Sequence, residues 1–318
     1  MKDIFLCEKM RGMEDGVPLY SKDTYWGKAP ASELAAAIEV IDGTDWEEFG
    51  KRYRNKFDFT FDEDRADWRF NIPLGKDSVV LDIGAGLGRS TIPLARVVRR
   101  VVAFDASLLR MRFLKRLAEK NKLSNVDVFV GDIFDLPLRR GSFDLVAMNG
   151  ILEWVGKTDR FKDPRAAQVA CLRICRDLLK PGGSLYVGIE NRFAVAYLRG
   201  TDHSGLRYTS FLPRIVADFY SRLRGRGRYD TYTYSKSGYE KLFHEAGFRK
   251  SDFFLVYPGY NRPKITIPYD DLNVLEYVIK VLLPSGGWKR SFLKMCAVYP
   301  ALWLYRKVFF SFNIIARP

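Results

Sequence analysis

The sequence predicts an α/β fold: a doubly wound, mostly parallel sheet with an N-terminal helical extension and C-terminal insertions. Between Ser78 and Asn191, short apolar runs alternate with helical stretches, and strands are apolar throughout when both of their faces are buried. A turn with three glycines, residues 84–88, follows the first run. The 318 residues are 47% hydrophobic and 28% charged, which is typical of a folded protein with a sizeable core.

Five strands and three helices are expected in this central region. The strands lie at 79–82, 101–105, 126–130, 143–148 and 184–189, and the helices at 89–98, 108–122 and 164–179. Further helices are expected at 32–41, 45–57 and 235–246. Further strands are expected at 252–257 and 309–316. Strand–helix–strand units form parallel sheets, which bind ligands beyond the carboxyl ends of their strands.

The chain is expected to have three parts. Residues 1–75 form the helical extension, and residues 76–257 form the ligand-binding core, with a basic insertion at 192–234. Residues 258–318 combine an insertion that faces substrate or membrane with the last strand. Insertions of this length are expected to carry structure of their own.

Basic residues are concentrated in the C-terminal part. Residues 1–191 hold 31 Lys and Arg against 29 Asp and Glu, whereas residues 192–318 hold 21 against 9. This excess, which includes arginines at 222, 224, 226 and 228, favours an anionic partner: a phosphorylated substrate, an acidic lipid surface or a nucleic acid. A solvated basic surface is the alternative.

The cysteines and histidines indicate no metal site. The four cysteines contain no C-x-x-C pair and there are only two histidines, too few ligands for a Cys/His site. We therefore expect no metal and a reducing, cytoplasmic location. The first twelve residues lack the apolar core of a signal peptide.

The strongest motif is Asp82-Ile83-Gly84-Ala85-Gly86-Leu87-Gly88. Glycines allow a tight turn and a close approach of backbone to ligand, and the next helix offers free N–H donors. The spacing G-x-G-x-G, with an acid before it, differs from the dinucleotide pattern G-x-G-x-x-G. A carboxylate at Asp82 would repel phosphates and suits a ligand with an ammonium or sulfonium charge. An ordinary tight turn is the alternative.

Polar residues also end the next strands. Asp105 stands 21 residues after Gly84, where a carboxylate can accept both hydroxyls of a ribose. It could instead cap the following helix, a role open also to Ser107. Asp132 and Asn149 follow the third and fourth strands.

This series resembles the class I S-adenosylmethionine-dependent methyltransferases, and the chain is expected to be such an enzyme. The resemblance implies a seven-stranded Rossmann-like sheet with S-adenosylmethionine as cofactor. It further implies that the glycine turn lies under the methionine moiety, Asp82 holds the amino group, Asp132 accepts from the adenine beside Ile133, and Asn149 closes the pocket. The expected cofactor-binding residues are Asp82, Gly84, Ala85, Gly86, Gly88, Asp105, Ala106, Asp132, Ile133 and Asn149.

Candidates for a general base lie at and after the last two of the five central strands. Methyl transfer depends on orientation and exclusion of water, and a hydroxyl acceptor also needs a base. Glu153, Glu190 and His203 are the candidates. The alternatives are a structural or cofactor-side role for Glu153, an ion pair of Glu190 with Arg192, and a simple surface position for His203.

A looser resemblance links the chain to a branch associated with surface-polysaccharide assembly. Its residues are Gly188-Ile189-Glu190-Asn191-Arg192, 232–235, 245–248, 257–260 and 312–316. It implies transfer of methyl to an oxygen of a glycan, a phosphorylated sugar or a lipid-linked sugar. The aromatic, basic segment 288–307 is a candidate for peripheral contact with the inner face of the membrane.

Other functions stay open at this point. RNA or another small molecule could be the acceptor, although no Asn-Pro-Pro-Tyr follows the fourth strand, and this disfavours methylation of a base amino group. The chain could also bind the cofactor without turnover, as a partner of a glycosyltransferase. The sequence does not indicate the oligomeric state.

Overall fold

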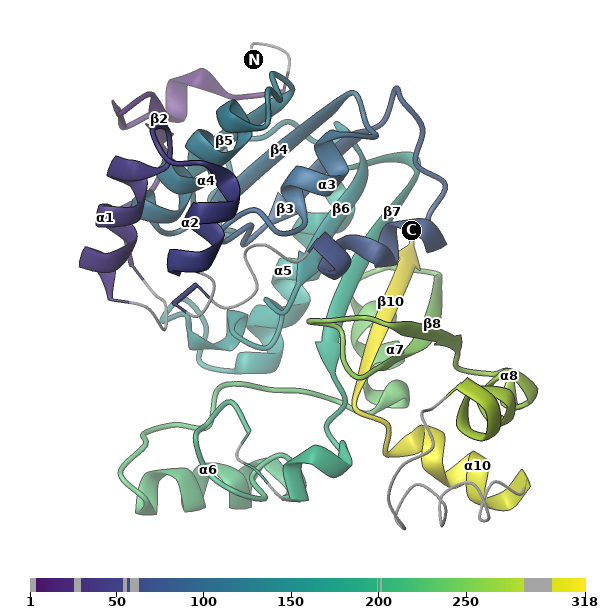
Figure 1. Ribbon diagram of the computed structural model, residues 1–318. Helices are drawn as coiled ribbons and strands as arrows, with labels where there is room; N and C mark the ends of the chain where they lie inside the picture. Colours follow the sequence, from purple (N-terminus) through teal and green to yellow (C-terminus); the bar gives the residue numbers. More distant parts are fainter. Residues whose placement is uncertain are drawn as a thin grey trace. The chain divides into compact units, whose positions relative to one another are not determined.

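The computed structural model describes residues 4–25, 30–53, 56–57, 63–198, 200, 202–282 and 299–318. The chain divides into two compact units (Figure 1). The first consists of Met1–Asn149, Arg173–Tyr186 and Arg317–Pro318, and the second of Gly150–Leu172 and Val187–Ala316. Residues 288–298 of the predicted membrane segment 288–307 lie outside the described residues.

The first unit holds a mostly parallel sheet. Its strands are β1 (Gly12–Glu14), β2 (Val17–Leu19), β3 (Val79–Ile83), β4 (Arg100–Asp105), β5 (Val126–Val130) and β6 (Phe143–Asn149). Their order is β1-β2-β5-β4-β3-β6, followed by the first part of β7 (Leu179–Glu190). The neighbours from β2 to β6 pair in parallel, so the carboxyl ends of β3, β4, β5 and β6 meet at one edge.

The N-terminal segment contributes to this sheet as well as to its cover. β1 and β2 form an antiparallel hairpin whose turn residues Asp15 and Gly16 have φ of 48° and 69°. The Asp-Gly pair is typical of such two-residue turns. The expected helices are present as α1 (Ala31–Val40) and α2 (Trp46–Tyr53), and the two strands were not predicted.

Helices α1, α2 and α4 (Leu108–Lys120) share one apolar cluster with the sheet. Phe49 of α2 lies 6.2 Å from Phe113 of α4, measured between ring centroids. Two more helices follow the expected positions: α3 (Thr91–Ala95), shorter than predicted, and α5 (Pro164–Leu178), whose residues belong partly to each unit.

A 3-10 helix, η2 (Glu63–Asn71), completes the first unit. Its Trp68 is fully buried and stacks on Tyr186 with ring centroids 3.8 Å apart. This contact fixes η2 against β7.

The second unit holds the rest of β7 and three further strands. These are β10 (Ser311–Arg317), β8 (Lys250–Tyr257) and β9 (Ile265–Pro268), in the order β7-β10-β8-β9. β8 and β10 are the expected last two of seven strands, and β9 is an addition that pairs antiparallel with β8. Phe312 of β10 packs at the centre of this unit, 5.8 Å from Phe253 and 6.2 Å from Tyr239 between ring centroids.

The described α-helices that lie wholly in the second unit are α6 (Arg214–Leu223), α7 (Lys236–Glu245), α8 (Leu272–Tyr277) and α10 (Tyr299–Lys307). The expected helix α7 begins at its cap Ser235, whose side chain accepts from the Gly238 N–H at 3.4 Å. The basic insertion contains α6, which was not predicted. In the part of the chain that the structure describes, no helix is both long and apolar enough to cross a bilayer.

Candidate active site

The glycine turn after β3 has the backbone that its sequence requires. Gly84, Gly86 and Gly88 have φ of 64°, 56° and 88°, in the left-handed region that favours glycine. A Cβ on Gly88 would lie 2.3 Å from Cδ1 of Leu114, so this position is also limited by packing. The Ala85 N–H donates to the Phe104 carbonyl at 3.0 Å and joins the turn to β4.

Asp82 is buried beneath this turn. Its Oδ2 accepts from the Thr91 hydroxyl of α3 at 2.6 Å. Burial raises the pKa of Asp82 to about 6, against the opposing effects of the Thr91 hydrogen bond and the positive charge of Arg65. The carboxylate therefore holds α3 against β3 in this structure.

Asp105 joins the ends of two elements. Its Oδ2 accepts from the Gly86 N–H at 3.2 Å and from Arg110 at 3.3 Å, and its Oδ1 accepts from the Ser107 N–H at 3.1 Å. The cap of α4 is Ser107, whose hydroxyl accepts from the Arg110 N–H at 3.4 Å. Ser107 thus fills the capping role that the sequence left open between the two residues.

Arg65 lies at the same edge and was not predicted as a site residue. Its guanidinium donates to the Asn149 carbonyl at 2.7 Å, and the Asn149 amide donates back to the Arg65 carbonyl at 3.4 Å. It belongs to η2, a 3-10 helix in an otherwise irregular stretch without helical spacing.

The remaining cofactor candidates lie in the loops after β4 and β5. The Asp132 Oδ1 accepts from the Phe134 N–H at 2.9 Å, Ile133 is half-buried, and the Ala106 carbonyl accepts from Thr24 at 2.8 Å. All ten predicted cofactor residues therefore belong to the first unit, at or just beyond the carboxyl ends of four neighbouring parallel strands.

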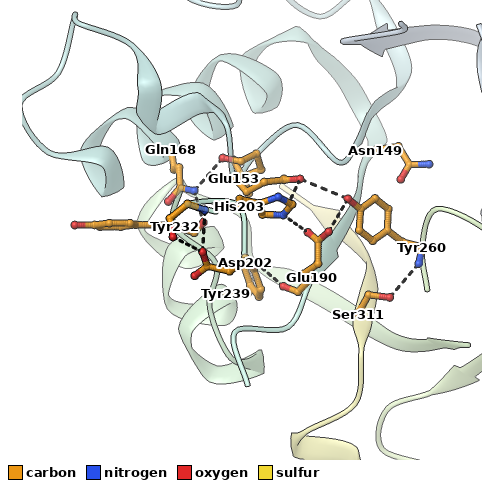
Figure 2. A network of polar contacts seen from close by, with 12 residues as sticks. Asn149, Glu153, Gln168, Glu190, Asp202, His203, Tyr232, Tyr239, Tyr260 and Ser311 are labelled. Atoms are coloured by element: carbon orange, nitrogen blue, oxygen red, sulfur yellow. Dashed lines mark hydrogen bonds and ion pairs between the residues drawn. The ribbon is translucent and has the colours of Figure 1, made fainter. Parts of the chain in front are cut away.

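The three predicted general-base candidates come together in the second unit. Figure 2 shows Glu153, Glu190 and His203 with Tyr260, and we call these four residues the acid–imidazole cluster. The His203 Nε2 lies 3.1 Å from Glu190 Oε2 and 3.9 Å from Glu153 Oε1. The Tyr260 hydroxyl donates to Glu190 Oε1 at 3.0 Å and lies 3.5 Å from Glu153 Oε1.

This cluster is strongly coupled by charge. Glu153 is fully buried, and the His203 side chain is 21% exposed. Burial alone would lower the pKa of His203, but the hydrogen bond and charge of Glu190, with the charges of Glu153 and Asp202, raise it to about 9. Burial would raise the pKa of Glu190, and the contact with His203 outweighs it and lowers that pKa. At neutral pH the imidazole is therefore protonated beside the Glu190 carboxylate.

Two of the alternative roles proposed from the sequence for the general-base candidates are wrong. Arg192 does not pair with Glu190: its guanidinium donates to the carbonyls of Ser210 and Leu212 at 2.5 and 2.6 Å. His203 is not a surface residue, because its ring packs 4.8 Å from the ring of Trp154, between centroids.

The backbone around the cluster is adapted to Tyr260. Gly150 has a φ of 75°, and a Cβ there would lie 2.7 Å from the Tyr260 hydroxyl and 2.9 Å from its ring. The Tyr239 hydroxyl donates to the Glu190 carbonyl at 3.0 Å and holds the end of β7. Neither tyrosine was predicted as a site residue.

A cavity of about 340 Å³ opens onto the cluster within the second unit. Its lining residues are Glu190, Ala194, Ala196, Tyr197, Asp202, His203, Pro258, Gly259, Tyr260, Asn261, Phe310 and Ser311. Titratable and hydroxyl groups thus face the same space as apolar rings. This combination is typical of a binding site for a small polar molecule.

The cluster also has the donor types of a metal site. One potential ligand atom from each of Glu153, Glu190 and His203 lies within 4.8 Å of the others. The expectation of no metal rested on cysteine and histidine ligands, and a mixed group of two carboxylates and one histidine was not predicted.

Comparison with known proteins places these features in a family. Residues 81–187 match the family model described as a methyltransferase domain. This range runs from β3 into β7 and contains the glycine turn and all the polar strand ends described above. The chain contains a class I S-adenosylmethionine-dependent methyltransferase domain.

Relatives of this methyltransferase domain differ in what they are named for. The chain is 28% identical over 205 residues to ubiquinone biosynthesis O-methyltransferase of Xanthomonas euvesicatoria, covering 63% of this chain and 75% of that protein. It is 32% identical over 120 residues to 23S rRNA (uracil(1939)-C(5))-methyltransferase RlmD of Aeromonas salmonicida, covering 34% of this chain and 27% of that protein. The chain thus spans about a quarter of one relative and three quarters of the other.

Among solved structures, the chain resembles a phosphoethanolamine N-methyltransferase 2 of Haemonchus contortus in complex with phosphomonomethylethanolamine and S-adenosylhomocysteine. The TM-score is 0.47 at 17% identity, over 81% of this chain and 53% of that one.

The basic arginines beyond the methyltransferase domain have mixed roles. Arg222 pairs with Asp218 at 2.8 Å, and Arg228 donates to the carbonyls of Lys162 and Gly156 at 2.7 and 3.2 Å. Arg224 and Arg226 are exposed.

Proposed function

We propose that the chain transfers the methyl group of S-adenosylmethionine to an oxygen acceptor bound in the cavity of the second unit. The observation that carries this proposal is the acid–imidazole cluster at the cavity wall. A histidine paired with a carboxylate is the usual arrangement for taking a proton from a hydroxyl.

The proposed cofactor site is the carboxyl edge of β3 to β6. The turn of Gly84, Gly86 and Gly88 would lie under the methionine moiety, with Asp105 accepting from the ribose. Asp132 and Ile133 would meet the adenine. Arg65 adds a positive charge near Asp82, and a pair of opposite charges suits the ammonium and carboxylate of an amino acid.

The proposed reaction is a single displacement. The acceptor oxygen forms a bond to the methyl carbon while the carbon–sulfur bond breaks, leaving the neutral thioether. The hydroxyl proton passes to the imidazole of His203 in its neutral form, and Glu190 stabilises the resulting imidazolium. Glu153 and Tyr260 hold these two groups in place through the contacts described above.

The proposed acceptor is a hydroxyl of a glycan, a phosphorylated sugar or a lipid-linked sugar, in the cytoplasm or at the inner face of the membrane. Two features support it: the resemblance to the polysaccharide-associated branch and the basic excess of residues 192–318. Peripheral membrane contact through 288–307 belongs to the same proposal. The relatives are named for transfer to oxygen, nitrogen and carbon, so the acceptor atom is part of what is tested.

The test is transfer of labelled methyl from S-adenosylmethionine to glycan, lipid and RNA fractions. We expect alkali-stable label in a glycan or lipid-linked fraction. We expect His203→Gln to lower the rate of this transfer at least about 100-fold. The matched control is His244→Gln, because His244 is an exposed histidine on α7. Label confined to RNA contradicts the proposed acceptor, and cofactor binding without any labelled product supports a non-catalytic partner instead.

A further inference from the structure

Helix α6 belongs to the second unit and is labelled in Figure 1. Its large apolar side chains are exposed to solvent. Four side chains on this ten-residue helix are exposed: Ile215 by 86%, Val216 by 46%, Phe219 by 67% and Leu223 by 71%. Its buried residues are Ala217 and Ser221. A helix on the surface of a soluble protein normally has the opposite arrangement.

The exposed residues form a continuous stripe. Ile215, Phe219 and Leu223 are spaced by four residues and lie above one another on one face of a helix. Val216 lies next to Ile215 on the adjoining face. Contiguous apolar surface of this kind usually marks a binding surface.

Polar contacts on the other side fix this orientation. The Asp218 Oδ1 accepts from the Tyr229 N–H at 2.9 Å. Arg214 donates to the Tyr229 hydroxyl at 3.4 Å and to the Thr233 carbonyl. The helix is thus held by its small and polar residues, and its apolar stripe cannot turn inward without breaking these bonds.

Arginines surround one end of the stripe. Arg222 has a side chain exposed by 57%, and Arg224 and Arg226 follow on the surface. A Cβ on Gly205 would lie 3.9 Å from Cζ of Arg226, so the loop that carries the exposed Arg207 runs beside this end. An apolar stripe with an arginine rim is the pattern of a helix that lies in the interface of an anionic bilayer.

We propose that α6 docks the protein on an anionic lipid surface, with the apolar stripe inserted at the headgroup boundary. A second copy of the chain suits this face less well, because a symmetric contact would bring the same arginines together. The proposal concerns described residues outside 288–307, and it does not depend on which acceptor is methylated.

The test is sedimentation of the full chain with vesicles of phosphatidylglycerol and phosphatidylcholine, compared with phosphatidylcholine alone. We expect binding to the anionic vesicles that falls as salt rises. Phe219→Ser with Leu223→Ser is expected to weaken it at least about 100-fold, because both side chains lose their burial in lipid. Arg224→Gln with Arg226→Gln is expected to weaken it about 30-fold.

The control is Phe70→Ser, because Phe70 is 75% exposed in the first unit, and it should bind like the unchanged protein. Thermal unfolding checks that each variant is folded. Equal binding to neutral vesicles, or binding unaffected by the Phe219 and Leu223 changes, overturns the proposal. So does a dimer in sedimentation velocity that these two changes dissociate, which would make the stripe a contact between copies.

Discussion

Replacing Glu190 by Gln tests whether His203 receives the proton. With a pKa of about 9, His203 is neutral in about 1% of molecules at pH 7. If the neutral imidazole is the base, kcat/KM rises about tenfold per pH unit and levels off above pH 9. Glu190→Gln removes the interaction that contributes most to raising that pKa, so we expect the rising limb to move below about pH 8.

The assay is the pH profile of kcat/KM between pH 6 and 10, measured by S-adenosylhomocysteine release. The plateau of the variant is expected to fall as well, because Glu190 no longer stabilises the imidazolium. Glu240→Gln is the matched control, since Glu240 pairs with Lys236 on α7 at 2.6 Å. The rising limb of its pH profile should stay at the same pH as in the unchanged protein. A profile without a rising limb, or a limb unmoved by Glu190→Gln, refutes the role of His203 as base.

Four further predictions concern stability, binding and metals. Because the pKa of His203 is raised, its stabilising contribution is complete below about pH 6.5 and is lost as pH rises through 9. The free energy of unfolding should therefore fall by up to about 3 kcal/mol across this range. The same measurement on His203→Gln should show no such fall. Gly88→Ala places a Cβ against Leu114. It should lower the free energy of chemical unfolding by about 2 kcal/mol more than Gly182→Ala does. Gly182 is the matched control, because its φ of 80° is similar and its added Cβ would meet nothing within 4 Å. Calorimetric titration should show that Arg65→Ala weakens S-adenosylmethionine binding about tenfold or more; unchanged affinity would remove Arg65 from the cofactor site. EDTA should leave the methyl transfer rate unchanged, and a loss restored by Mn²⁺ would make the acid–imidazole cluster a metal site.

The sequence was informative where local rules decide the structure. The apolar runs at 79–82 and 101–105 predicted parallel strands, because strands buried on both faces are apolar nearly throughout. The glycine spacing predicted a tight turn, and Gly84, Gly86 and Gly88 all have left-handed backbone there. Strand ends of a parallel sheet share an edge, so the predicted cofactor residues were placed together by topology alone.

The acid–imidazole cluster depended on distant parts of the chain. Glu153, Glu190 and His203 were each chosen for their positions along the chain, but their mutual distances are set by the path of the loop after β7. Tyr260 joins them from beyond β8, and no local pattern marks it. Arg65 was missed for a similar reason, because its position depends on the stacking of Trp68.

The inverted pattern of α6 shows a different limit. Periodicity of apolar residues predicts a helix but not the direction that its apolar face takes. Here the polar bonds of Arg214 and Asp218 decide that direction. An ordinary reading of the same spacing would have placed Phe219 in the core.

The fit between Gly150 and Tyr260 has a consequence for redesign of the chain. The ring of Tyr260 occupies the space that any side chain at position 150 would need. Gly150 can therefore be substituted only together with Tyr260. An alanine at 150 requires something slimmer than an aromatic residue opposite it, and that exchange would enlarge the chamber beside Glu190. Acceptors of greater bulk are therefore best sought by altering both positions at once.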